Sequence, residues 1–344
     1  MESFHVRKLI SKKKQSYRVQ DPLRKYLEHH GRCTKLSLDY HDLLRFSNSS
    51  PVCDKNGDQT CWISVSYPAW EQKEIFAALI EVYAILKADG NVALMEHLEV
   101  DRVDLCLFGN SKPFRIRIIN TINDNFDYFY VKKADASRIY GLELEHLLSP
   151  NRIGFLISQD TVVIEHIFGI PGDAFILKFM NHNLNEVRLA KEFVKFNERC
   201  FLRLLGDMHA SNFVVDITLD VEEANYRIRA IDFDQQSYEG RLKVYLPQFF
   251  YENNPIVKIG LEALTYRSVK QYQAEERYLI SKRLKTANRR FRNLMEVMIQ
   301  DSIAPEAQVK QLGEELAEHY KKDVFRTCHS MGELVIKSLE TIEN

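Results

Sequence analysis

Apolar and polar positions switch between helix-like and strand-like spacing along the chain. From residue 69 to 88 apolar side chains recur at helical intervals, with Pro68 before them and Gly90 after them, which predicts a helix. From residue 103 onward, apolar and polar residues alternate as is typical of strands. Three strands in an antiparallel meander are predicted, at 103–108, 114–118 and 128–133.

A second helix and two more strands continue this strand-rich part of the chain. The helix is expected over 136–148, and the strands over 153–157 and 162–167. Helical spacing then runs from 174 to 201, and nearly everything beyond residue 245 is also predicted to be helical.

The order of these elements predicts an α+β protein with two lobes. A strand-rich lobe with one helix would occupy residues 99–168, and a larger, mainly helical lobe would occupy 169–344. Residues 1–98 would form an N-terminal extension of unknown role, in which Asn56-Gly57 favours a hairpin turn.

Composition and charge narrow the class of protein. The 344 residues are 45% hydrophobic and 28% charged, which excludes a collagen-like or largely disordered chain. Lys and Arg total 47 against 48 Asp and Glu, a net charge of −1. A dedicated nucleic-acid binder carries a strongly basic field, so this class of partner is not expected.

One local charge pattern departs from this balance. An apolar face between residues 280 and 298 has a basic stripe opposite it, made of Lys282, Lys285, Arg289 and Arg292. Such a stripe is usually a surface that faces water. The alternative is contact with an anionic partner, which keeps nucleic acid as a minor possibility for this stretch.

Membrane and secreted classes are not expected. The longest mostly apolar run, 75–86, is interrupted by Glu81 and is shorter than the roughly 20 residues that span a bilayer. The basic cluster near the N-terminus follows a broken apolar stretch, which is the wrong order for a secretory signal, so we expect a cytoplasmic protein. Six cysteines without a CxxC pair indicate neither a disulfide framework nor a zinc ribbon.

The candidate chemistry lies in two short stretches. Gly206-Asp207-Met-His-Ala-Ser-Asn212 carries an Asp and an Asn five residues apart, and Asp232 follows twenty residues later at the end of an apolar segment. Phosphoryl transfer from ATP needs a carboxylate near the acceptor hydroxyl, and an amide and a carboxylate that hold Mg²⁺ against the phosphates. These three side chains supply those groups, whereas the P-loop and GxGxxG motifs are absent.

Both stretches resemble motifs of the protein-kinase-like superfamily, and more closely its aminoglycoside phosphotransferase and choline kinase branch than the eukaryotic protein kinases. The loop 206–212 is similar to the HGDxHxxN motif of that branch, and Ile231-Asp232-Phe233 to its metal-binding I-D-[FW] motif. The resemblance covers about residues 100 to 245. It implies a kinase-like two-lobed fold, and an ATP- and Mg²⁺-dependent kinase that phosphorylates a hydroxyl of a small molecule.

The resemblance also implies roles for individual residues. Asp207 would be the catalytic base, Asn212 and Asp232 would bind Mg²⁺, and Lys132 would hold the α- and β-phosphates of ATP. His209 is interpreted as a hydrogen-bonding residue of the loop.

Three further assignments concern the binding of ATP and its metal ion. Glu143 on the helix 136–148 would pair with the strand lysine, and Glu145 is the alternative. The strand that ends with Glu165 and Ile167 would occupy the hinge position, where backbone groups bind the adenine edge. Asp234 could coordinate a second metal or orient the loop.

Two rival hypotheses remain open, and two departures from the family pattern favour the first of them. Leu205 stands where many members carry His before the Gly-Asp pair, and the loop between the first two strands has one glycine, Gly109, in place of a glycine-rich run. The first rival is therefore a catalytically inactive, nucleotide-binding scaffold protein of the pseudokinase type. The second is a nucleotidyl transferase that transfers AMP.

Overall fold

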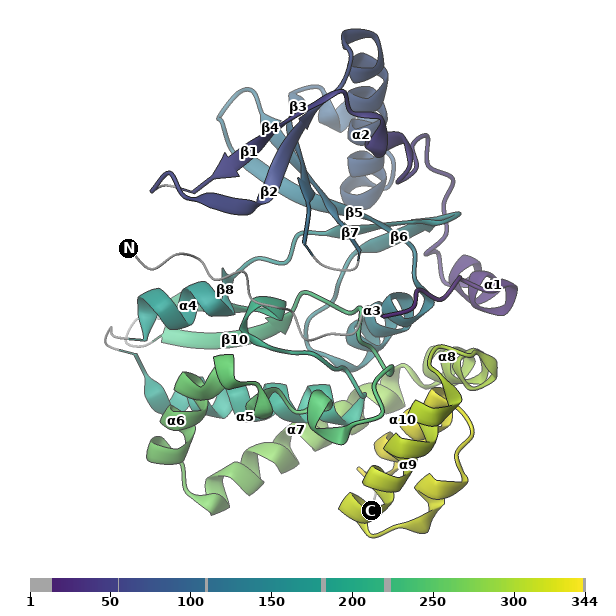
Figure 1. Ribbon diagram of the computed structural model, residues 1–344, viewed down its shortest axis with the longest axis vertical. Coiled ribbons are helices and arrows are strands. Elements are labelled where there is room, and N and C mark those ends of the chain that lie inside the picture. Colours follow the sequence, from purple (N-terminus) through teal and green to yellow (C-terminus); the bar gives the residue numbers. More distant parts are fainter. Residues whose placement is uncertain (1–13, 55, 109–110, 181–183, 220–223, 343–344) are drawn as a thin grey trace.

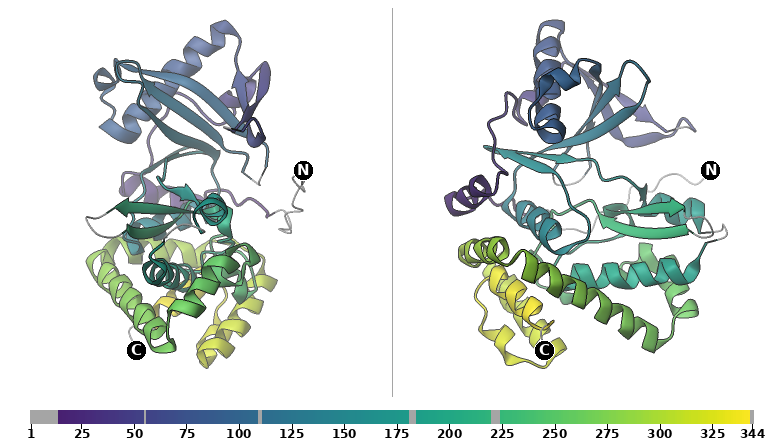
Figure 2. Two further views of the ribbon diagram at one scale, coloured as in Figure 1. Left: turned by 90° about the vertical axis from the view of Figure 1, so that its left-hand side faces the viewer. Right: turned by 180° about the vertical axis from the view of Figure 1, so that it is seen from behind.

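A lobe built on an antiparallel sheet is stacked on a mainly helical lobe (Figures 1 and 2). The computed structural model describes residues 14–54, 56–108, 111–180, 184–219 and 224–342. Gly109 and the basic cluster before Lys14 lie outside the described residues. The predicted α+β architecture of a sheet lobe and a helical lobe is confirmed.

In the described part of the chain, the larger sheet has seven antiparallel strands in the order β1-β2-β3-β4-β5-β7-β6, and a smaller sheet has the order β10-β9-β8. The strands of the larger sheet are β1 (Asn48–Cys53), β2 (Gln59–Ser66), β3 (Leu98–Cys106), β4 (Phe114–Asn120), β5 (Phe126–Lys133), β6 (Phe155–Ser158) and β7 (Thr161–Glu165). Those of the smaller sheet are β8 (Ile170–Pro171), β9 (Phe213–Leu219) and β10 (Ala224–Ala230). The predicted meander is confirmed as β3, β4 and β5.

Strand alternation gives this sheet an apolar face that a helix covers. In β4 every second side chain is buried, and Phe114 and Ile116 are fully so. They pack in one core with Leu79 and other apolar residues of α2 (Ala69–Ala88), the helix predicted from periodicity. Burial of one such Phe side chain stabilises the fold by about 1.5–3 kcal/mol.

The sheet extends beyond the lobe boundary expected at residue 98. Strands β1 and β2 come from the expected N-terminal extension, and β2 pairs with β3 through Trp62 opposite Cys106. The helix α2 from the same stretch contributes to the core under the sheet. The division of the chain into domains stays a prediction, but residues 48–88 belong structurally with the sheet.

A central helix, α3 (Ala136–Leu148), joins the two lobes. Twelve of its residues are buried, and it belongs to a second large core with β6, β7 and the helices below (Figure 1). The other helices are α1 (Asp21–His29), α4 (Gly172–Phe179), α5 (Glu186–Leu202), α6 (Asn254–Ala263), α7 (Tyr266–Thr286), α8 (Asn288–Gln300), α9 (Glu306–Tyr320) and α10 (Met331–Glu340). Among the described residues, no helix is long and apolar enough to cross a membrane.

Two stretches predicted to be continuously helical are each broken. The stretch 174–201 forms α4 and α5, because the Asn185 side chain accepts a hydrogen bond from Arg188 N at 3.1 Å and begins a new helix. The stretch 280–298 is divided between α7 and α8 at Ala287, where φ and ψ are −98° and 17°. The residues of the apolar face across this break are buried or partly buried in one core, which confirms that part of the prediction.

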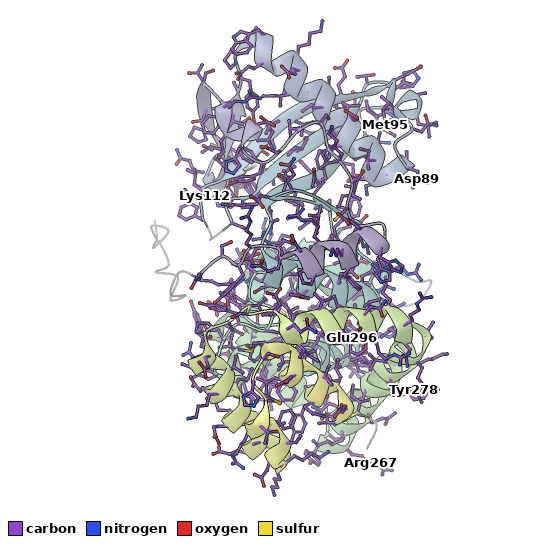
Figure 3. All side chains as sticks on the ribbon, turned by 90° about the vertical axis from the view of Figure 1, so that its right-hand side faces the viewer. Asp89, Met95, Lys112, Arg267, Tyr278 and Glu296 are labelled. Carbon is purple, nitrogen blue, oxygen red and sulfur yellow. The ribbon has the colours of Figure 1, made fainter. Side chains whose placement is uncertain are left out.

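The predicted basic stripe of α7 and α8 is exposed. Its four members, Lys282, Lys285, Arg289 and Arg292, all lie on the surface. Glu296 is also exposed on α8, four residues after Arg292 (Figure 3). A mixed, exposed face of this kind is typical of a helix surface in water.

Two helical glycines test the packing of the helical lobe. A Cβ at Gly332 on α10 would lie 2.6 Å from Met298 O on α8, whereas a Cβ at Gly260 on α6 would meet nothing within 4 Å. We expect Gly332→Ala to lower the free energy of unfolding by about 1–3 kcal/mol through forced separation of the two helices. Gly260→Ala should raise it by about 0.5–1 kcal/mol through helix propensity. Urea unfolding measures both, and a neutral Gly332→Ala would contradict the close α8–α10 contact.

Candidate functional site

The predicted catalytic loop is held in place by its own polar groups. It follows α5 and leads through Asn212 into β9. Asp207 has a φ of +63°, in the left-handed region that Asp and Asn tolerate better than most residues, and its N–H donates to Val244 O at 3.1 Å. The amide nitrogen of Asn212 donates to Asp207 O at 2.7 Å and lies 3.2 Å from His209 Nε2. The side-chain oxygen of Asn212 is therefore the atom left for a cation.

The second motif lies directly beside this loop. Ile231 N donates to Asn212 O at 3.0 Å, so the adjacent residue, Asp232, follows directly after the contact with the end of the loop. Lys132 Nζ on β5 is 3.9 Å from Asp232 Oδ1. The structure thus brings four predicted site residues, Lys132, Asp207, Asn212 and Asp232, to the junction of the sheet lobe and the helical lobe.

Negative charge accumulates at this junction. Burial, followed by the nearby carboxylate of Asp232 and those of Glu239 and Glu252, raises the pKa of Asp207 to about 7. Burial and Asp234 also raise the pKa of Asp232, against the opposing effect of Lys132. A carboxyl with a pKa near neutrality can accept a proton, and the excess negative charge favours binding of a cation.

The Asp234 carboxylate is engaged by a buried arginine. Its Oδ1 accepts a hydrogen bond from Arg138 Nε at 2.5 Å, and both side chains are nearly buried. Burial alone would raise the pKa of Asp234, but the charges of Arg138 and Lys132 outweigh it and hold that pKa below its usual range. Asp234 N also donates to Asp232 Oδ1 at 3.1 Å. Of the two roles considered for Asp234, orientation of the loop is the one that these contacts fit.

Arg138 is a site residue that the sequence reasoning missed. It lies in the first turn of α3 and is 4% exposed, an unusual position for an unpaired charge. The sequence did contain one signal for this residue. An arginine in a largely apolar helix needs a buried partner of opposite charge, so its position indicates an ion pair.

The predicted ion pair between Lys132 and Glu143 is not formed. Glu143 is fully buried and accepts hydrogen bonds from Arg290 Nη2 at 2.7 and 2.8 Å, from Arg32 Nε at 2.9 Å and from Tyr26 OH at 2.7 Å. These partners belong to α1, the segment after it and α8, so both carboxylate oxygens of Glu143 are engaged by these elements.

The alternative partner, Glu145, is also engaged elsewhere. It forms an ion pair with Arg203, just after α5, and both side chains are buried. Within the described residues, the ion-pair partner of Lys132 is therefore Asp232 rather than a carboxylate of α3.

The predicted hinge residues lie at the end of β7. Glu165 N donates to Gly154 O at 2.9 Å, and the Glu165 carboxylate accepts a hydrogen bond from Gly154 N at 2.5 Å. Lys87 Nζ lies 3.5 Å from Glu165 Oε2. Ile167 follows the strand and is buried, and neither of its backbone groups forms a hydrogen bond to a described residue. The peptide at Ile167 is thus the one of the two that remains available for a ligand.

The donor set suits a magnesium ion that arrives with a nucleotide. In the described part of the chain, no three His, Cys, Asp or Glu side chains gather closely enough to hold a metal ion by themselves. Mg²⁺ is commonly bound by one or two protein oxygens together with phosphate oxygens and water. The side-chain oxygens of Asn212 and Asp232 fit this requirement.

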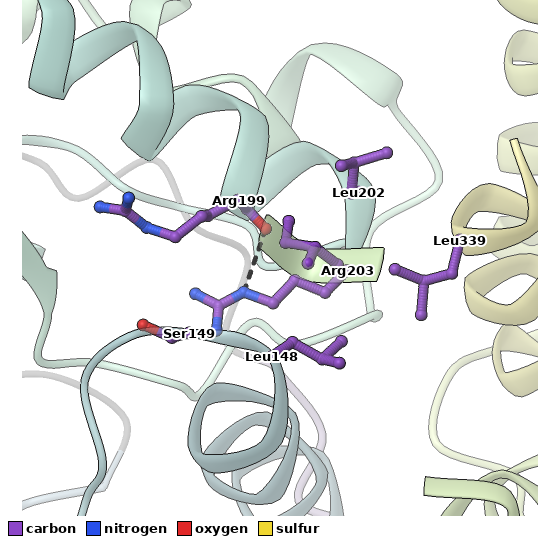
Figure 4. A pocket seen from close by; sticks show the side chains of 7 residues that line it. Leu148, Ser149, Arg199, Leu202, Arg203 and Leu339 are labelled. Carbon is purple, nitrogen blue, oxygen red and sulfur yellow. Dashed lines mark hydrogen bonds between the residues drawn. The ribbon is translucent and has the colours of Figure 1, made fainter. Parts of the chain in front are cut away.

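Two cavities lie away from these residues. One of about 440 Å³ is lined by charged residues of α5, β10 and α7, including Lys195, Arg227 and Glu276. The other is a narrow gap beside Arg203 that has no room for a water molecule, and there Arg203 Nε donates to Arg199 O at 3.1 Å (Figure 4). No residue of the candidate site lines either cavity.

Two solved structures with a distant likeness to this chain are both of titin kinase. No family model and no curated protein matches the chain. The autoinhibited serine kinase domain of the giant muscle protein titin is 13% identical, with a TM-score of 0.28, over 71% of this chain and 93% of that one. Titin kinase with its flanking domains is 14% identical, with a TM-score of 0.27, over 70% of this chain and 54% of that one. Overlaps this low assign the chain to no family and give no residue a role.

Replacement of Asp207 by Asn is expected to stabilise the metal-free chain at alkaline pH. The pKa of about 7 in the folded chain exceeds the ordinary 3.8, so the wild type loses stability as the pH rises from about 4 to about 7. An Asn side chain does not ionise, so the variant does not lose this stability as the pH rises, and Asn also tolerates the positive φ. Since Asp207 is partly exposed, we expect a gain of about 2 kcal/mol at pH 8 and less than about 1 kcal/mol at pH 5.

Urea unfolding with EDTA at the two pH values measures this gain. The matched control is Asp124→Asn, because Asp124 is exposed and also has a positive φ, +56°. An equal gain at pH 5 and pH 8, or the same pH-dependent gain in the control, would contradict the raised pKa.

Proposed function

We propose that this protein is an ATP- and Mg²⁺-dependent phosphotransferase that acts on a hydroxyl group of a small molecule. The observation that carries the proposal is the meeting of Lys132 from the sheet lobe with Asp232, beside the loop in which Asn212 is bonded to Asp207. One cation, two metal-ligand oxygens and one carboxyl with a raised pKa are the groups that phosphoryl transfer needs. The motif resemblance supports the same reaction, while the small-molecule acceptor rests on the resemblance alone.

Each residue has a defined task in this reaction. Asp207 accepts the proton of the acceptor hydroxyl as the oxygen–phosphorus bond forms and ADP leaves. Lys132 neutralises negative charge on the phosphates, which it can do by exchanging part of its interaction with Asp232. Asn212 and Asp232 hold the Mg²⁺, which when bound neutralises charge on the phosphate oxygens.

The adenine would bind at the end of β7. The backbone groups of Ile167 are available there, and the buried Ile167 side chain gives the segment a fixed position. The N–H and the carboxylate of Glu165 are both hydrogen-bonded to Gly154, so Glu165 stabilises the end of the strand and does not bind the adenine.

A nucleotide-binding protein without turnover is the second candidate function. The specific observation in its favour is the engagement of Glu143 with Arg290 and Arg32, which leaves Lys132 without a carboxylate from α3. The two candidates agree on binding of Mg²⁺ and ATP and differ on chemistry.

Two substitutions separate binding from chemistry. Asp232→Asn should remove the Mg²⁺-dependent part of the thermal stabilisation by ATP, together with turnover. Asp207→Asn should retain that stabilisation and lower ADP release at least about 100-fold, since it removes the proton acceptor. Thermal shifts with ATP, with and without Mg²⁺, and an ADP-release assay against pooled sugars, amino alcohols and nucleosides provide the measurements, with Asp124→Asn as the control.

The outcomes distinguish the candidates. Equal loss of nucleotide response in both variants would contradict the separate roles. Metal-dependent stabilisation of the wild type without turnover on any pool would favour the binding protein. An acceptor that gains about 80 Da carries phosphate, whereas a gain of about 329 Da would identify AMP transfer instead.

A further inference from the structure

The segment that precedes α1 is fastened to the start of α3 by a buried ion pair. Lys14 Nζ lies 2.8 Å from Asp135 Oδ1, and the two side chains are 4% and 8% exposed. Tyr17 N donates to Asp135 Oδ2 at 2.9 Å, and Ala136 N donates to Tyr17 O at 2.8 Å. This N-terminal segment is thus an integral part of the structure around α3.

Asp135 stands between two cations. It is the residue that caps α3, where its Oδ1 accepts a hydrogen bond from Arg138 N at 3.3 Å. The negative charges of Asp135 and Asp234 both stabilise the Arg138 guanidinium, and Asp234 accepts the hydrogen bond from Arg138 Nε. Arg138 Nη1 donates a hydrogen bond to Lys133 O.

Loss of the Lys14 charge would change the balance of charge around this guanidinium. Without the Lys14 ammonium, Asp135 would be a buried carboxylate whose negative charge still acts on the Arg138 guanidinium. A buried, unpaired carboxylate is costly, so it would compete with Asp234 for the guanidinium. Asp234 would then lose the contact that fixes the peptide whose N–H holds Asp232 Oδ1.

We propose that Lys14 is a positioning residue of the cation site: it neutralises Asp135, keeps Arg138 on Asp234, and so holds the Asp232 carboxylate in the orientation that binds Mg²⁺ with ATP. This inference rests on the proposed function, and it assigns the segment before α1 a role in metal binding. Lys14 acts through Asp135 and Arg138 and does not touch the nucleotide.

The test compares Lys14→Met with Lys14→Arg, and uses Lys25→Met as a matched control because Lys25 is an exposed lysine on α1. Thermal stabilisation is measured with ATP over a series of Mg²⁺ concentrations. Lys14→Met should raise the Mg²⁺ concentration for half-maximal stabilisation about tenfold, while stabilisation by ATP in EDTA stays unchanged. Lys14→Arg should restore the wild-type value. A Mg²⁺ dependence in Lys14→Met equal to that of Lys25→Met would overturn the proposal.

A compensating substitution tests the mechanism and guards against poor folding of the single variant. Lys14→Met combined with Asp135→Asn has no unpaired buried carboxylate, and Asn can still cap α3. This double variant should bind Mg²⁺ with ATP as the wild type does. A double variant that remains as defective as Lys14→Met would show that competition for Arg138 is not the cause, and would overturn the proposal.

A separate readout applies if the wild type shows no response to ATP and Mg²⁺, which would defeat the proposed function itself. The melting temperatures of Lys14→Met, Asp234→Asn and their combination then measure the coupling of two residues that do not touch. The proposed network predicts that the double variant loses clearly less than the sum of the single losses. Additive losses would show that Lys14 does not act on Asp234.

Discussion

The ion pair between Arg138 and Asp234 is the interaction on which the candidate site depends. It joins α3, which packs beneath the large sheet, to the segment after β10 that carries the predicted metal ligand. Both side chains are nearly buried, so neither can lose its partner without leaving an uncompensated charge, at a cost of about 3–5 kcal/mol. The neighbouring backbone N–H holds Asp232, and the position of Lys132 relative to that carboxylate follows from this contact.

The same helix is fixed a second time, further along its length. Glu143 is held by Arg290, Arg32 and Tyr26, which tie α3 to α8 and to the chain around α1. Rotation of α3 that brought Glu143 to the strand lysine would have to break this cluster as well as the pair at Arg138. In this candidate site the strand lysine pairs with Asp232, and Glu143 joins α3 to its neighbouring elements.

The sequence predicts those parts that local patterns determine. The meander, α2 and α3 follow from periodicity, and Asp207, Asn212 and Asp232 meet because short motifs on adjacent loops bring them together. The pairing of Glu143 with Lys132 was predicted wrongly, since its partner Arg290 lies 147 residues away and no local pattern links the two. The break at Ala287 was missed for a related reason: the apolar face continues through it, so periodicity carries no signal of the interruption.

The central claim is that Mg²⁺ and ATP bind where Lys132, Asp207, Asn212 and Asp232 meet. The most direct measurement is a crystal structure with Mn²⁺, located by its anomalous signal, and a non-hydrolysable ATP analogue. The account predicts Mn²⁺ bonded to a carboxylate oxygen of Asp232 and to the side-chain oxygen of Asn212, with the terminal phosphate facing Asp207 and Arg138 still on Asp234. A nucleotide bound elsewhere, or Mn²⁺ on Asp234 with Arg138 displaced, would contradict it.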